Sequence, residues 1–241
     1  MSKLDVNDQL IEALLGRVAP LVERTTGWNL DLVNLRSKVI PKERGYEEIL
    51  LGRLRDLGFF VDEDMPRPLL DRLVEYLVES SVQAAYQTGK GELLVVRENV
   101  DDSNLDGLCV VIAHELVHRG QHINHPEIFQ QIEETVHRVI APYFSSPDQI
   151  DLGELLQALN EIQPFMTLIE SHAAYIQQLI ANRYYPQARI ETHFTLPIMI
   201  FRLFGSQKLS QYTDGLPAIA TAISSGEMEY LYRNPKLIFS T

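Results

Sequence analysis

The sequence predicts an α+β fold dominated by helices. Two short segments with β-like character lie early in the chain, at about residues 30–40 and 91–98. Apolar residues recur with helical spacing at residues 5–24 and through most of the chain beyond residue 104. Because strands come early and helices late, the pattern favours segregated strands and helices over an alternating α/β arrangement.

Each expected element depends on a local pattern. The clearest strand spans about residues 92–98, where an aliphatic run follows Gly91, and we expect it at an edge of a small sheet. The next helix follows the stretch Asp101-Asp102-Ser103-Asn104, which offers N-cap residues, with Asp106 three residues past Ser103 as a capping-box partner. Further helices are expected at about residues 46–57, 68–86, 126–142, 150–159, 161–184, 194–205 and 214–232.

Composition narrows the classes of partner and compartment. The formal net charge of −12 disfavours binding to nucleic acid and to anionic membranes, so we expect neither partner. The single cysteine, Cys109, lies in an apolar run and allows no intramolecular disulfide. The first residues do not resemble a signal peptide, and no stretch approaches the ~18–20 apolar residues that span a bilayer. A cytoplasmic location is therefore the expectation.

The segment HELVH at residues 114–118 has the spacing of a metal-binding helix. Residues four apart share one helical face, so His114 and His118 can bring two imidazole nitrogens to one metal ion. Glu115 need not bind the metal, because it can act as a general base toward a water molecule. The surrounding residues are apolar, and a buried glutamate with two imidazoles requires a partner, which a metal would provide.

The strand LLVV followed by VVIAHELVH resembles the core of the zincin superfamily of metallopeptidases. The resemblance implies a zinc ion held by His114 and His118, Glu115 as the catalytic base, and a third ligand from further along the chain. The metzincin pattern is excluded, because Gln121 and Asn124 stand where it requires glycine and histidine.

A gluzincin-like site requires a downstream glutamate. The short-spacing version would place this glutamate near residue 137 or 138. The chain has His137 and Arg138 at these positions, so only His137 could serve as the ligand there. Glu170, an acid in an otherwise apolar helix, is the better candidate, and ESHAAY resembles the third-ligand helix of long-spacing gluzincins and of uncharacterised bacterial zincin-like hydrolases. Ala174 departs from that pattern, which puts in doubt the carboxylate that often orients a zinc histidine. His137 and His172 remain the alternative third ligands.

The sequence thus predicts one zincin-like domain over residues 1–241, with N-terminal helices and sheet in 1–100 and the active-site helix and C-terminal helices in 101–241. The expected activity is zinc-dependent peptide-bond hydrolysis by metal-activated water, with a peptide or protein as substrate. His172 and Tyr175 are candidates for orienting a ligand or binding an oxyanion. A zincin fold used for binding or regulation, and a hydrolase of small amides, are the alternatives.

Overall fold

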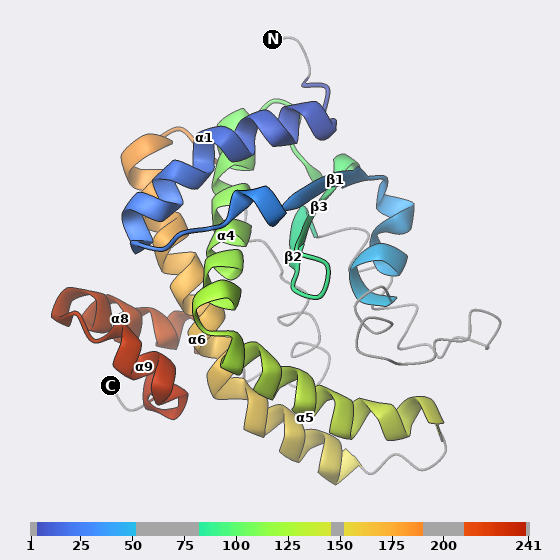
Figure 1. Cartoon of the computed structure of the whole chain (residues 1–241), viewed down its shortest axis with the longest axis vertical. Coiled ribbons are helices and arrows are strands. Elements are labelled where there is room, and N and C mark those ends of the chain that lie inside the picture. The colour runs from blue at the N-terminus through green and yellow to red at the C-terminus, as the bar shows by residue number, and fades with distance from the viewer. Residues whose placement is uncertain (1–3, 52–81, 146–151, 190–209, 240–241) are drawn as a thin grey trace.

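The computed structural model describes residues 4–51, 82–145, 152–189 and 210–239 (Figure 1). These residues form mostly helices and one three-stranded sheet, which confirms the helix-dominated α+β class. The strands are β1 (Arg36–Ile40), β2 (Ala84–Gln87) and β3 (Glu92–Val96). The α-helices are α1 (Asp8–Thr26), α4 (Leu105–Asn124), α5 (Pro126–Ser145), α6 (Leu152–Tyr184), α8 (Ser210–Ser225) and α9 (Met228–Arg233). Shorter helical segments are η1 (Leu32–Asn34), η2 (Lys42–Arg44), η3 (Tyr46–Leu51), η4 (Arg97–Asn99) and η7 (Pro235–Phe239).

The sheet has the order β1-β3-β2, with β3 parallel to β1 and antiparallel to β2. The predicted edge position of the strand at 92–98 is therefore wrong, because β3 is central and β2 is an edge strand of the described sheet. The four consecutive residues Leu93–Val96 are all buried, as expected of a strand covered on both faces.

Three helix predictions also differ from the structure. Residues 84–86 fall within the helix expected over 68–86, but they belong to β2, because pairing with β3 outweighs the helical preference of the two alanines. The predicted helices 150–159 and 161–184 are one helix, α6, which continues through Pro164. The predicted helix 214–232 is two, because Gly226 adopts a left-handed conformation after α8. Residues 52–57, 68–81 and 194–205 lie outside the described part of the chain.

The N-terminus of α4 is capped, but not by the predicted pair. Asn104 Oδ1 accepts a hydrogen bond from the backbone N–H of Gly107 at 2.9 Å. The Ser103 hydroxyl instead donates to Asp101. Asn104 caps more directly than a Ser103–Asp106 box would, because it immediately precedes the first helical residue.

Helix α4 runs through the middle of the fold, with α1, α6 and the sheet around it (Figure 1). A first hydrophobic cluster joins α1, the sheet, α4 as far as Val117 and the C-terminal part of α6 from Ala173. A second joins α5, α6 before Glu170, α8, α9 and η7. Polar residues of α4 and α6 lie where the two clusters meet, and this boundary holds the candidate site. No helix in the described ranges is long and apolar enough to cross a membrane.

Candidate metal centre

Helix α4 brings two histidines together on one buried face. The Nε2 atoms of His114 and His118 lie 3.1 Å apart, and both residues are buried. Four-residue spacing places the two rings one turn apart, as the sequence predicts.

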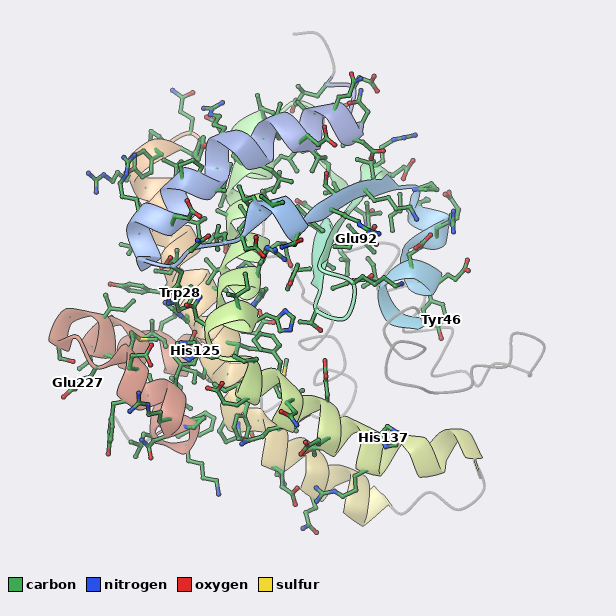
Figure 2. All side chains as sticks on the ribbon, in the orientation of Figure 1. Trp28, Tyr46, Glu92, His125, His137 and Glu227 are labelled. Atoms are coloured by element: carbon green, nitrogen blue, oxygen red, sulfur yellow. The ribbon has the colours of Figure 1, made fainter. Side chains whose placement is uncertain are left out.

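Helix α6 adds Glu170 to the pair. Its Oε2 atom lies 3.4 Å from His114 Nε2 and 3.6 Å from His118 Nε2. Among the described residues, these three form the group of side chains able to hold a metal ion. The alternative third ligands are elsewhere, with His137 exposed on α5 (Figure 2) and His172 directed toward Tyr232.

Two glutamines fix the orientation of the histidine rings. His118 Nδ1 donates to Gln121 Oε1 at 2.8 Å, and Gln121 Nε2 donates to the carbonyl of Ile169 at 2.8 Å. His114 Nδ1 donates to Gln177 Oε1 at 3.2 Å. With each Nδ1–H engaged by an amide oxygen, the Nε2 atom of each ring is left to face Glu170. Gln177 thus orients the ring of His114, which is the role that a carboxylate at the position of Ala174 often has.

The three acceptor atoms require a positive charge between them. Burial alone would lower the pKa of His118, but the Glu170 carboxylate raises it to about 9. Burial would raise the pKa of Glu170, but His118 and His114 hold it well below its usual range. Either a proton on His118 or a metal ion in its place satisfies the group.

The donor set fits a zinc ion. Zinc bound tetrahedrally at about 2.0–2.1 Å requires ligand atoms about 3.3 Å apart. The three separations of 3.1, 3.4 and 3.6 Å surround that value. Two imidazoles and one carboxylate are also a ligand set found at catalytic zinc sites. The fit therefore extends to both the geometry and the chemistry of the donors.

Glu115 lies beside this group but is held by another element. Its Oε2 atom accepts a hydrogen bond from the backbone N–H of Tyr86, on β2, at 2.8 Å. The side chain is buried, and burial raises the pKa of its carboxyl group. A carboxylate with a raised pKa is better suited to accept and return a proton near neutral pH than an exposed one.

The side chain of Tyr86 is also fixed to α4. Arg119 Nη1 donates to the Tyr86 hydroxyl at 3.3 Å, and the same hydroxyl lies 3.1 Å from His122 Nδ1. The buried Arg119 guanidinium in turn donates from Nε to the carbonyl of Leu30 at 2.6 Å. These contacts hold β2 at a fixed position beside the histidine-bearing helix.

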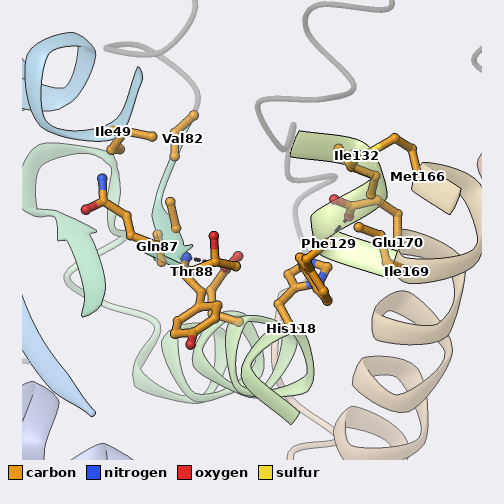
Figure 3. Close-up of a pocket in the computed structure, with 14 residues that line it drawn as sticks. Ile49, Val82, Gln87, Thr88, His118, Phe129, Ile132, Met166, Ile169 and Glu170 are labelled. Carbon is orange, nitrogen blue, oxygen red and sulfur yellow. Dashed lines mark hydrogen bonds and ion pairs between the residues drawn. The ribbon is translucent and has the colours of Figure 1, made fainter. Parts of the chain in front are cut away.

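A pocket opens between β2 and the pair α5 and α6, with α4 as its floor (Figure 3). Glu115, His118 and Glu170 line it, so two of the three candidate ligands and the base face the same space. The remaining lining is largely apolar, and Figure 3 shows Ile49 and Val82 opposite residues of α5 and α6. Those residues are Phe129, Ile132, Met166 and Ile169.

His172 and Tyr175 are not among the described residues that line this pocket. His172 Nδ1 lies 2.6 Å from the Tyr232 hydroxyl, and its ring meets Trp28 edge-on at 5.2 Å. Burial and the nearby His125 lower the pKa of His172 to about 3, so the ring is neutral. Tyr175 packs against both hydrophobic clusters. A catalytic role for either residue stays a prediction without a contact to support it.

Sequence reasoning missed Gln121, Gln177 and Tyr86. A search for polar residues one turn from each histidine would have found Gln121, which follows His118 by three residues. Gln177 and Tyr86 reach the site only through packing of α6 and β2, and no local pattern indicates it.

No protein-family model, curated protein or solved structure matches the chain. The resemblance to zincins therefore stays a prediction from the motif residues, and the geometry of the site is the basis for assigning a function.

Proposed function

We propose that the chain is a zinc-dependent metallopeptidase of gluzincin-like type, with His114, His118 and Glu170 as zinc ligands and Glu115 as general base. The observation that carries the proposal is the convergence of two Nε2 atoms and one carboxylate oxygen within 3.1–3.6 Å, beside a pocket that the buried Glu115 also lines. A divalent ion held there would polarise a carbonyl oxygen and lower the pKa of a water molecule.

Glu115 is placed to move protons in such a reaction. It would accept a proton from the attacking water and pass it to the leaving amine. Its raised pKa supports both transfers, because the carboxylate is neither too weak a base nor too weak an acid. The Tyr86 N–H fixes one carboxylate oxygen and so orients the other.

The edge strand β2 supports a peptide as substrate. Tyr86 pairs with Leu93 but directs its N–H away from β3, toward Glu115. In an antiparallel pair, hydrogen-bonded and non-hydrogen-bonded positions alternate, so the backbone groups of Ala84 also point away from β3. A strand that presents backbone groups beside a pocket is suited to pair with an extended peptide.

One observation favours the alternative of a binding or regulatory protein with little turnover. The hydrogen bond from the Tyr86 N–H engages one carboxylate oxygen of the proposed base. With its base held in this way, the protein would still bind zinc and a ligand but would transfer protons slowly. The small-amide alternative predicts the same metal site with a narrower substrate range.

The test is a peptide-library cleavage assay of the zinc-loaded protein, with Glu115→Gln as the matched variant. We expect cleavage by the wild type that a chelator stops and added zinc restores. Glu115→Gln should keep its zinc, measured by elemental analysis, and lose cleavage by about 100-fold or more, the size of a general-base contribution. Bound zinc without cleavage would establish the binding alternative, and cleavage of small acyl amides alone would establish the other.

A further inference from the structure

One face of α4 holds the edge strand β2 through a single residue, Tyr86. Glu115 accepts a hydrogen bond from the Tyr86 backbone N–H at 2.8 Å, and Arg119 donates from Nη1 to the Tyr86 hydroxyl at 3.3 Å. His122 Nδ1 lies 3.1 Å from the same hydroxyl. The intervals of four and three residues place these three side chains on one face of the helix. This face is turned by about a quarter of a turn from the face that carries the two candidate zinc histidines.

Arg119 is the buried cation at the centre of this face, with 4% of its surface exposed. Its Nε atom donates to the carbonyl of Leu30 at 2.6 Å, and its Nη2 atom donates to the carbonyl of Asp31. The Asp31 carboxylate lies 3.8 Å from Nη2 and is itself about half exposed. A guanidinium presents its donors in a rigid planar fork, so three acceptors on different sides fix its position.

A buried charge of this kind contributes little to stability by itself. Moving a cation out of water costs free energy, and an apolar side chain of similar volume often stabilises a fold as well or better. The donors of Arg119 do what an apolar side chain cannot, because they join three segments at fixed distances. Those segments are the chain at residues 30–31, the helix α4 and the strand β2, which lies beside α4 (Figure 1).

Tyr86 is thereby held at both ends. Its hydroxyl accepts from Arg119, which leaves its own proton free to be donated to His122 Nδ1. The guanidinium carbon also lies 5.9 Å from the centre of the tyrosine ring. At the other end, the backbone N–H donates to Glu115. The strand cannot move away from α4 at this residue without breaking one of these bonds.

The position of β2 in turn determines where the Glu115 carboxylate lies. One of its oxygens is bonded to β2, and the carboxylate lines the same pocket as His118 and Glu170. A general base must lie within hydrogen-bond distance of the proton that it accepts. A displacement of about 1 Å at a reacting group can lower the rate by about 100-fold.

We infer that Arg119 is a positioning residue, which anchors the Tyr86 hydroxyl and so fixes the backbone N–H that orients Glu115. The inference rests on the proposed function, in which Glu115 is the general base. It assigns a role to the residue that directly follows the HELVH motif and to the face of α4 that does not bind the metal.

The experiment compares Tyr86→Phe with Tyr230→Phe. Tyr86→Phe keeps the ring and the backbone N–H and removes only the hydroxyl, while Tyr230 has 60% of its surface exposed. For the peptide that the zinc-loaded wild type cleaves fastest, we expect kcat of Tyr86→Phe to fall about tenfold, since pairing with β3 still limits the displacement. Tyr230→Phe should match the wild type.

Zinc affinity separates positioning of the base from damage to the metal centre. It is measured by competition with a chromogenic chelator. Tyr86→Phe should bind zinc as the wild type does, because the hydroxyl bonds to Arg119 and His122 and not to a proposed zinc ligand. A fall in zinc affinity as large as the fall in kcat would show that the hydroxyl supports the whole centre, and would overturn the inference.

A double-mutant cycle tests whether the hydroxyl acts through Arg119. Arg119→Lys keeps the charge but loses the planar fork of donors, so it should lower kcat by about tenfold or more. Adding Tyr86→Phe to Arg119→Lys should then lower kcat no further. Additive losses would overturn the assignment to Arg119. The control is Arg183→Lys, which changes an exposed arginine whose guanidinium carbon lies 5.3 Å from the ring centre of Tyr184.

Hydrogen exchange in the metal-free protein distinguishes failure of the inference from failure of the proposed function. The backbone amide of residue 86 should exchange slowly in the wild type. In Tyr86→Phe it should exchange up to about tenfold faster, the size expected from loss of one hydrogen bond, while the amides of β3 keep their rates. If the wild type shows no zinc-dependent cleavage, the proposed function fails and the exchange rates alone decide the positioning role. Unchanged exchange at residue 86, or equally faster exchange throughout β3, would overturn that role.

Discussion

The two helices that supply the candidate ligands differ in how they are packed. Every residue of α4 from Gly107 to Gln121 is buried, so the helix is enclosed on all sides. In α6, buried residues alternate with exposed ones such as Gln178 and Leu179. An enclosed helix fixes its own side chains, and spacing alone then places His114 and His118. Glu170 reaches the site only because α6 packs against α4.

The most informative way to test this difference is to remove one ligand from each helix. His118→Ala leaves only one imidazole and one carboxylate as donors, with the packing of α4 otherwise unchanged. We expect zinc affinity to fall by more than about 100-fold, because a direct ligand contributes more than the outer partners whose loss costs about 10–100-fold. The measurement is zinc stoichiometry after dialysis against a metal buffer.

The matched control is His137→Ala, which removes an exposed histidine of α5. It should keep the full zinc content of the wild type. Loss of zinc from His137→Ala, with retention in His118→Ala, would show that the wrong histidines have been assigned.

On α6, Glu170→Gln should have a smaller effect. The amide keeps the shape of the side chain and a neutral oxygen donor but loses the negative charge. Zinc affinity should therefore fall by about 10–100-fold, comparable to the loss of a strong orienting partner. Competition with a chelator measures it. Unchanged affinity would show that the third ligand is another residue, while the assignment of His114 and His118 would stand.

The same difference explains what the sequence could predict. His114 and His118 belong to one helix, so a local pattern contains their geometry. Glu170 was found because an acid in an apolar helix requires a partner, although its distance to the histidines follows from tertiary packing. The residues of β2 have no strand pattern in the sequence. Their conformation is decided by pairing with β3. The contact of Tyr232 with His172 joins distant segments, and single-residue patterns contain no information about it.

Two glycines at close helix contacts test how firmly each helix is held, and their substitution is expected to have the smallest effect. A Cβ atom added at Gly120 of α4 would lie 2.5 Å from Trp28 Cε3 and 3.1 Å from Leu30 Cδ2. One added at Gly215 of α8 would meet Ser171, the neighbour of Glu170, with Ser171 Cβ at 2.9 Å. Both substitutions by alanine overpack a close contact, which typically costs about 1–3 kcal/mol.

The two variants should differ in their effect on zinc. In Gly120→Ala the rigid ring of Trp28 must move, so we expect the larger loss of thermal stability. In Gly215→Ala the shift falls on the turn of α6 that holds Glu170, so zinc affinity should fall more for a smaller change in melting temperature. Gly16→Ala is the control, because a Cβ there meets nothing within 4 Å and alanine favours the helix by up to about 1 kcal/mol. Equal losses of zinc affinity in Gly120→Ala and Gly215→Ala would show that α6 holds its ligand as firmly as α4 does.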